Sequence, residues 1–195
     1  MIEFHPISID DFAWAAPIMR SSNYMCCGYS FVTQFMWSHA YNTHIAKYDD
    51  WVLIRSDVGD ACYYLWPAGK SGDERKALEA IERDAERIGR PMYLYSVTLE
   101  AKTQLEEWYP GKFTITSDRA DYDYIYEQAN LAELPGRRFQ KKRNHVSRFI
   151  RENPDWQFHF LTKEDLPAIR EFNNAWCQLY ENKDNPGIQT EHESI

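Results

Sequence analysis

The chain has 195 residues, of which 44% are hydrophobic and 15% aromatic, so it can bury a sizeable core and global disorder is excluded. Its formal net charge of -8 argues against unspecific coating of nucleic acid or acidic membranes, but leaves room for a local anion site. The four cysteines show no CxxC spacing, which argues against a disulfide framework and against a zinc site.

The first third of the chain is expected to form helices followed by a β-meander. Hydrophobic spacing predicts helices over 9–20 and 30–40, the second of them capped by Ser30. Strand-like runs follow over 44–47, 51–55 and 61–66, and the polar turns between them favour antiparallel pairing.

The middle of the chain alternates between further predicted helices and strands. Helices are predicted over 77–88, 99–108 and 128–134, and strands over 92–97, 113–116 and 122–126. The last of these strands carries Tyr122, Tyr124 and Tyr126 on one face. Core packing against a helix is the simpler explanation for them, and a cation site or a pocket lining is the alternative.

The most informative segment is basic. From Arg137 to Arg151 there are seven Lys or Arg residues and no Asp or Glu, although the chain as a whole is acidic. Apolar residues at helical spacing predict a helix with a narrow apolar seam. Helix N-termini and Arg side chains both favour phosphate, so the first cations are candidate phosphate ligands. These candidates are Arg137, Arg138, Lys141, Lys142 and Arg143. A solvated face that pairs with the chain's surplus carboxylates explains the run equally well.

A new unit is expected to begin at Trp156, with a strand over 156–161 and an amphipathic helix over 162–180. The side chains expected to face inward from this helix are Leu166, Ile169, Phe172, Trp176 and Leu179. Thr190 and Glu193 have the spacing of a capping box close to the end of the sequence, which predicts that the chain is a fragment of a longer protein.

Common catalytic and cofactor motifs are incomplete. Gly69-Lys70-Ser71 resembles the end of a P-loop, but Tyr64 stands where the first glycine is needed. No histidine lies in HExxH or another metal-ligand spacing, and no serine lies in G-x-S-x-G. The adjacent Cys26 and Cys27 are better explained as small packed thiols than as a reactive pair. Neither a metal site nor a catalytic residue is predicted.

No localisation signal is recognisable. The N-terminal residues lack the basic region and apolar run of a signal peptide. No stretch approaches the roughly 18 apolar residues that a membrane span requires. The sequence therefore predicts a cytoplasmic protein without an integral membrane segment.

Two stretches resemble a known family. DYDYIYEQANLAELPGRRFQKKRNHVSRF, which begins at Asp121, and SSNYMCCGYSFVTQFMWSHAY, which begins at Ser21, are similar to segments of the phosphatidylglycerol lysyltransferase C-terminal-like proteins. The resemblance implies an α/β fold with a GNAT-like mixed, mainly antiparallel sheet flanked by helices. It also implies a first GNAT-like domain over 1–153 and the beginning of a second, truncated one over 154–195.

The resemblance also implies a function, namely an acyltransferase or aminoacyltransferase that uses acyl-CoA or aminoacyl-tRNA as donor. The five basic residues named above would contact the donor phosphates. No G-x-G pyrophosphate loop occurs among the eight glycines, which argues against an acetyl-CoA site in this chain. The membrane-spanning half of the lipid lysyltransferases is missing, so a lipid acceptor is not implied. The alternative is a non-catalytic scaffold module or inactive fragment, whose basic helix docks on an acidic partner or on the missing second domain.

Overall fold

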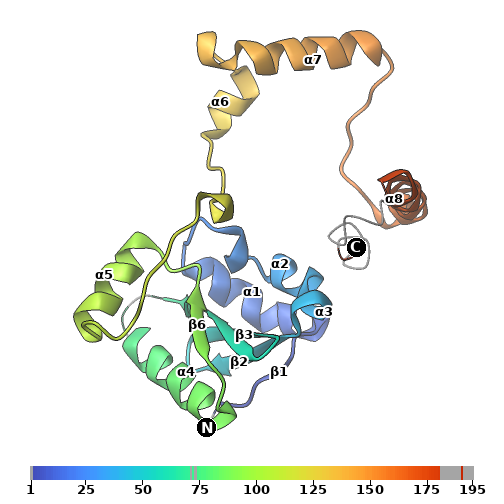
Figure 1. The fold of residues 1–195 in the computed structure, drawn as a ribbon. Helices are drawn as coiled ribbons and strands as arrows, with labels where there is room; N and C mark the ends of the chain where they lie inside the picture. Colours follow the sequence, from blue (N-terminus) through green and yellow to red (C-terminus); the bar gives the residue numbers. More distant parts are fainter. Residues whose placement is uncertain (1, 71, 73, 181–189, 191–195) are drawn as a thin grey trace. The chain divides into compact units, whose positions relative to one another are not determined.

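A computed structural model describes residues 2–70, 72, 74–180 and 190 of the chain (Figure 1). The described residues form two compact units. Unit 1 contains those up to Asp121 and those from Tyr180 on, and unit 2 spans Tyr122–Leu179. The predicted capping box lies outside the described residues, because Glu193 is not among them.

Unit 1 consists of a six-stranded sheet and the helices that cover it. The strands are β1 (His5–Pro6), β2 (Thr43–Tyr48), β3 (Trp51–Val58), β4 (Ala61–Leu65), β5 (Ala68–Gly69) and β6 (Met92–Tyr95). The α-helices are α1 (Phe12–Ser21), α2 (Phe31–Met36), α3 (Ser38–Tyr41), α4 (Glu74–Ile88) and α5 (Leu99–Trp108). Short 3-10 helices are η1 (Ile9–Asp11), η2 (Cys27–Tyr29) and η3 (Arg119–Asp121).

The sheet begins as the predicted meander. Its strand order is β1-β2-β3-β4-β6, and β5 pairs with β3. Every pairing is antiparallel except that of β4 with β6, which is parallel. Tyr48 lies opposite Trp51 across a tight turn in which Asp49 takes a φ of 50°. The expected mixed, mainly antiparallel sheet flanked by helices is confirmed.

The core lies on both faces of β3. Successive side chains of a strand point to opposite faces, so Val52 and Ile54 enter one hydrophobic cluster while Trp51 and Leu53 enter the other. Helices α1 and α5 supply the first cluster, and α4 supplies most of the helical part of the second. Figure 1 shows α4 on the side of the sheet away from α1. A strand that is buried on both faces reads as a continuous apolar run, which is what residues 51–54 are.

Unit 2 contains helices and the extended segments that join them. Its helices are α6 (Gln128–Glu133), η4 (Arg137–Phe139), α7 (Gln140–Glu152), η5 (Lys163–Asp165) and α8 (Leu166–Tyr180). Thr162 and Asp165 form a capping box at the start of the last helical stretch. The helices predicted from periodicity in this part of the chain are therefore confirmed.

Three predicted strands are wrong. Residues 113–116, 122–126 and 156–161 form no strand, and no described residue pairs with them in a ladder. An extended segment becomes a stable strand only when a neighbour satisfies its backbone N–H and C=O groups. The tyrosines of the second segment are also not core residues, because Tyr124 is 85% exposed.

The packing predicted for the last helix is also wrong at several positions. Phe172 is 70% exposed and Leu179 is 81% exposed, although both were expected to face inward. Among the described residues of unit 2, only Phe139 and Cys177 are buried. Unit 2 therefore has almost no core of its own. None of the described helices combines the length and the apolar character needed to cross a membrane.

Candidate anion-binding site

The basic segment forms the predicted helix, and a sharp reversal of the chain precedes it. Helix α6 ends at Glu133 and is capped by Leu134, whose φ of 47° lies in the left-handed region. Gly136, with a φ of 73°, then redirects the chain into η4 and α7. Glycine adopts this conformation without the steric cost that a side chain would bring. The turn places all five candidate cations at the start of one helical stretch.

Arg143 does not belong with the other four candidates. Its guanidinium donates a hydrogen bond of 2.7 Å to the carbonyl of Gly136 and another to the carbonyl of Leu134. The Leu134 carbonyl belongs to the cap of α6, and the Gly136 carbonyl lies in the turn that leads into η4. Arg143 therefore fastens the reversal between α6 and α7. This role distinguishes Arg143 from the other four predicted phosphate ligands.

Replacing Arg143 by alanine is expected to lower the free energy that stabilises this reversal by about 1–2 kcal/mol. This value is towards the lower end of the range for hydrogen bonds from charged groups, because the bond to the Gly136 carbonyl is exposed to water. Hydrogen exchange of the amides between Leu134 and Gln140 should accelerate accordingly. Lys141→Ala is the matched control, because this neighbouring cation makes no such bond. Equal exchange in the two variants would contradict the fastening role.

The remaining candidates, which we call the basic surface, are Arg137, Arg138, Lys141 and Lys142. All four are exposed. Within the described part of the chain, no carboxylate forms an ion pair with any of them. Their positive field adds to that of the free N–H groups at the start of the helix. The basic surface can therefore accept an anion without first breaking an internal ion pair.

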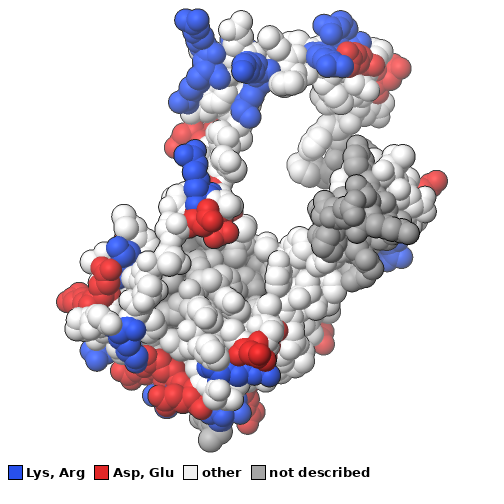
Figure 2. Space-filling view, in the orientation of Figure 1, with Lys and Arg blue, Asp and Glu red and all other residues white. Residues whose placement is uncertain are grey.

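At the C-terminal end of α7, unlike at its start, the cations lie beside a carboxylate. Arg148 pairs with Glu152 at 2.9 Å, and Arg151 lies 3.9 Å from the same carboxylate. Figure 2 shows Lys and Arg side chains along this helix, with carboxylates beside them at one end. The two explanations considered for the basic run therefore apply to different parts of it. Self-pairing fits the C-terminal end, and anion binding fits the N-terminal end.

Aromatic rings lie beside two members of the basic surface. The guanidinium carbon of Arg138 is 4.7 Å from the ring centroid of Phe139, and the ammonium of Lys142 is 5.8 Å from that of Tyr126. Cation–π contacts of this kind hold a long side chain near a ring without neutralising its charge. Tyr126 is 46% exposed, so the ring and the cation share one open surface within unit 2.

Unit 1 contains a buried ionic network that the sequence did not reveal. Asp84 on α4 accepts hydrogen bonds from Arg55 at 2.9 Å, from Tyr64 at 2.8 Å and from Arg87 at 2.6 Å. Burial alone would raise the pKa of Asp84, but the bonds from Arg87, Arg55 and Tyr64 outweigh it and lower that pKa below its usual value. Arg55 also donates to Asp57 at 3.2 Å. The network fastens α4 to the sheet.

One cluster in unit 1 contains the three residue types of a cysteine catalytic triad. Its carboxylate, Asp57, lies between Cys62 and His44, whereas in a triad the histidine lies in the middle. The thiol of Cys62 donates to Asp57 at 3.3 Å, and His44 lies 3.5 Å from the same carboxylate. Burial and the adjacent Asp57 carboxylate raise the pKa of the Cys62 thiol. A nucleophilic cysteine needs a neighbouring base and a lowered pKa. The cluster therefore lacks the arrangement of an activated cysteine nucleophile.

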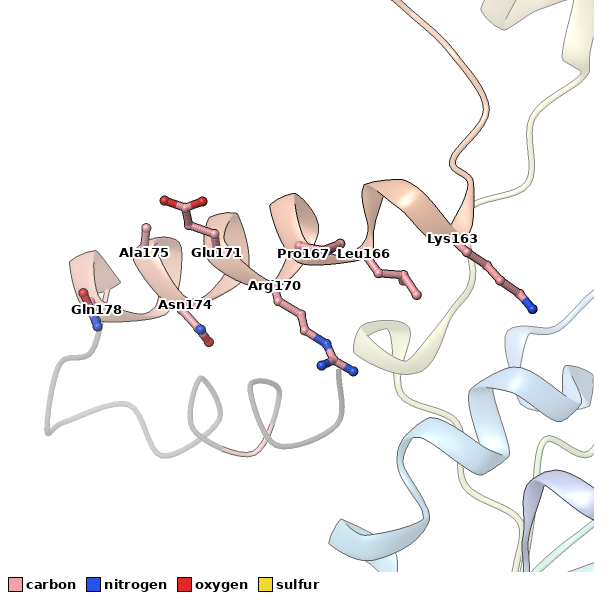
Figure 3. Close-up of a pocket in the computed structure, with 8 residues that line it drawn as sticks. All are labelled: Lys163, Leu166, Pro167, Arg170, Glu171, Asn174, Ala175 and Gln178. Atoms are coloured by element: carbon pink, nitrogen blue, oxygen red, sulfur yellow. The ribbon is translucent and has the colours of Figure 1, made fainter.

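A hollow beside α8 has a described lining that is not that of an active site. Its described lining residues all come from one stretch: Lys163, Leu166, Pro167, Arg170, Glu171, Asn174, Ala175 and Gln178. Figure 3 shows Lys163, Leu166 and Arg170 projecting on the same side of this stretch, and Glu171 on another. Ligand pockets usually collect convergent polar groups from several elements. We assign no chemistry to the hollow.

Comparison with known proteins gives one family and one solved structure. The family model described as "Phosphatidylglycerol lysyltransferase, C-terminal" matches residues 21–194. A conserved protein of unknown function from Bacteroides thetaiotaomicron VPI-5482 has 29% sequence identity and a TM-score of 0.91. The match covers 100% of this chain and 65% of that one, so the chain spans less than two thirds of that solved structure. No curated protein matches the sequence.

Proposed function

The chain belongs to the phosphatidylglycerol lysyltransferase C-terminal family, and we propose that it is the donor-binding part of an aminoacyltransferase that uses aminoacyl-tRNA. The observation that carries the proposal is the basic surface, whose four exposed cations have no carboxylate partner within the described residues. Such cations suit the phosphate backbone of a nucleic acid, where the release of condensed counterions drives binding.

The chemistry of the donor explains why a binding surface contributes so much. The aminoacyl group of such a donor is already an activated ester. The acceptor's nucleophile forms a bond to the carbonyl carbon of this ester, the bond from that carbon to the ribose oxygen breaks, and the proton that the nucleophile loses is balanced by the one that the ribose hydroxyl gains. Holding the donor in a fixed orientation therefore supplies much of the acceleration. In our proposal Arg137 and Arg138 take phosphates in bidentate fashion, while Lys141 and Lys142 widen the positive field. No residue of the chain is assigned to the chemical step.

Acyl-CoA is the less favoured donor. A CoA pyrophosphate is usually held by backbone N–H groups of a glycine-rich loop, and the eight glycines of this chain form no G-x-G. The basic surface offers side-chain cations in place of such a cradle. Long-range attraction of an extended polyanion suits this arrangement better than capture of one pyrophosphate.

We also propose that a second GNAT-like domain begins at residue 154, after a first such domain over 1–153. The apolar side chains of the following segment support this division, since Phe158 is 76% exposed and Phe160 is 85% exposed. Exposed apolar side chains next to one another mark surfaces that another element covers. The solved Bacteroides chain, which is longer than this one, is consistent with such an element.

The same apolar side chains favour a second candidate function, that of a non-catalytic docking module. In this alternative the basic surface binds an acidic polypeptide, and Phe158 and Phe160 take part in the same contact. Electrostatic contacts and an apolar anchor are the usual components of such an interface. The two candidates differ in the ligand that they predict for the basic surface.

A salt series distinguishes these possibilities. Binding of the chain to bulk aminoacyl-tRNA and to acyl-CoA would be measured by fluorescence anisotropy at increasing salt concentrations. Four phosphate contacts predict a plot of log K against log salt with a slope of about -3 to -4 for tRNA. Binding to acyl-CoA with a shallow slope would instead favour an ordinary acyltransferase. Absence of binding to either ligand would contradict donor binding by this chain and favour the docking module.

A further inference from the structure

We propose that the exposed tyrosines of the segment 122–127 bind the unpaired 3′ bases of the nucleic acid whose phosphates the basic surface holds. The inference rests on the proposed function and deepens it, because it names the part of the donor that is recognised. The residues that we assign to this binding are Tyr124 and Tyr126, for which the sequence pattern alone favours a place in the core.

The first argument is exposure. Tyr124 is 85% exposed and Tyr126 is 46% exposed, in a segment without regular secondary structure that ends at the cap of α6. Where backbone is extended, residues two positions apart point to the same side, so we expect these rings to share one face. The acidic Asp123 and Glu127 fall on the alternate positions and are expected to point away from it. Every nucleobase has a π-face, and stacking on an aromatic side chain tolerates any base sequence.

The second argument is the contact with the basic surface. The ammonium of Lys142 lies 5.8 Å from the ring centroid of Tyr126, so ring and cation are neighbours within unit 2. A phosphate held by Lys142 would place its own base close to this ring. Proteins that bind single-stranded nucleic acid combine these two elements, a positive track for the backbone and rings for the bases.

The chemistry of the rings separates them from the other exposed aromatics of unit 2. Phe158 and Phe160 contact each other, with ring centroids 5.5 Å apart, and neither ring lies beside a cation within the described residues. A polypeptide partner suits such a purely apolar pair. Tyr124 and Tyr126 instead carry hydroxyl groups and lie in a segment that touches the basic surface, which suits a wet, charged ligand.

The test compares two labelled RNA hairpins by fluorescence anisotropy, one blunt and one with a short unpaired 3′ tail. The wild-type chain should bind the tailed hairpin more tightly, because stacking of a base on a ring contributes roughly 5- to 150-fold in affinity. The double substitution Tyr124→Ala and Tyr126→Ala should remove this difference and leave the salt slope unchanged. Tyr126→Phe should retain it. Tyr41→Ala, at an exposed tyrosine of unit 1, is the control.

The outcomes separate this proposal from the proposed function. If both hairpins bind with a steep salt slope but equal affinity, the stacking proposal is overturned and donor binding stands. The stacking proposal is likewise overturned if the double substitution leaves the advantage of the tail intact. If neither hairpin nor aminoacyl-tRNA binds, the proposed function fails and the stacking proposal fails with it. Far-UV circular dichroism checks that the variants keep their helices.

Discussion

Replacing Asp84 by alanine is expected to destabilise unit 1 by about 3–5 kcal/mol, the range for removing one partner of a buried ion pair. Its side chain is 2% exposed and accepts bonds from Arg55, Tyr64 and Arg87. Without it, the hydroxyl of Tyr64 loses the acceptor that it has in the native structure. Since domains are stable by only about 5–15 kcal/mol, this loss is a large share of the stability of the unit.

Urea denaturation followed by far-UV circular dichroism measures this effect. The matched control is Glu79→Ala on the same helix, because Glu79 pairs with Arg75 at 3.5 Å and about half of each side chain is exposed. An exposed i,i+4 pair contributes about 0.3–0.5 kcal/mol. Similar losses in the two variants would show that the network does not fasten α4 to the sheet.

The pH dependence separates ion pairing from packing. The folded state lowers the pKa of Asp84, so its contribution is present above the pKa of the unfolded state and is lost as the pH falls through the folded value. The unfolded carboxyl has a pKa of about 3.9. The wild-type chain should therefore lose this part of its stability below about pH 4. Asp84→Asn, which cannot ionise, should show a correspondingly shallower fall.

The meander of unit 1 was predictable because its signals are local. The apolar run of β3, the polar turns on either side and the spacing in α4 are each contained in a short stretch of sequence. The ionic network was not predictable in the same way. Arg55 and Asp84 are 29 positions apart, and only the packing of α4 on the sheet brings them together. A lone arginine after the apolar residues 51–54 was the one available hint of a buried partner.

In unit 2, by contrast, local sequence patterns were not sufficient to predict the structure. Alternation in residues 122–126 and 156–161 predicted strands that the structure does not contain, because a strand also needs a neighbour, which a single segment cannot specify. The basic surface was predictable as a set of cations, since charge is a property of composition. The separate role of Arg143 was not, because it depends on where the carbonyls of Leu134 and Gly136 point.

Reversing the charge of two members of the basic surface is expected to abolish salt-sensitive binding of tRNA. Arg138→Glu with Lys142→Glu replaces two attractive contacts by two repulsive ones and changes the local charge by four units. Since each phosphate contact contributes close to one unit of salt slope, the remaining slope should be near zero. Filter binding or anisotropy with bulk aminoacyl-tRNA measures the effect.

The matched control uses the other end of the same helix. Arg148→Glu with Arg151→Glu makes the same change in net charge, but at side chains that already lie beside Glu152. If net charge alone governed association, the two double variants would weaken tRNA binding equally, and the assignment to the basic surface would fail. A loss confined to Arg138 and Lys142 requires an anion bound at the N-terminal end of α7. That end is where the cations are unpaired within the described residues and where the helix itself favours negative charge.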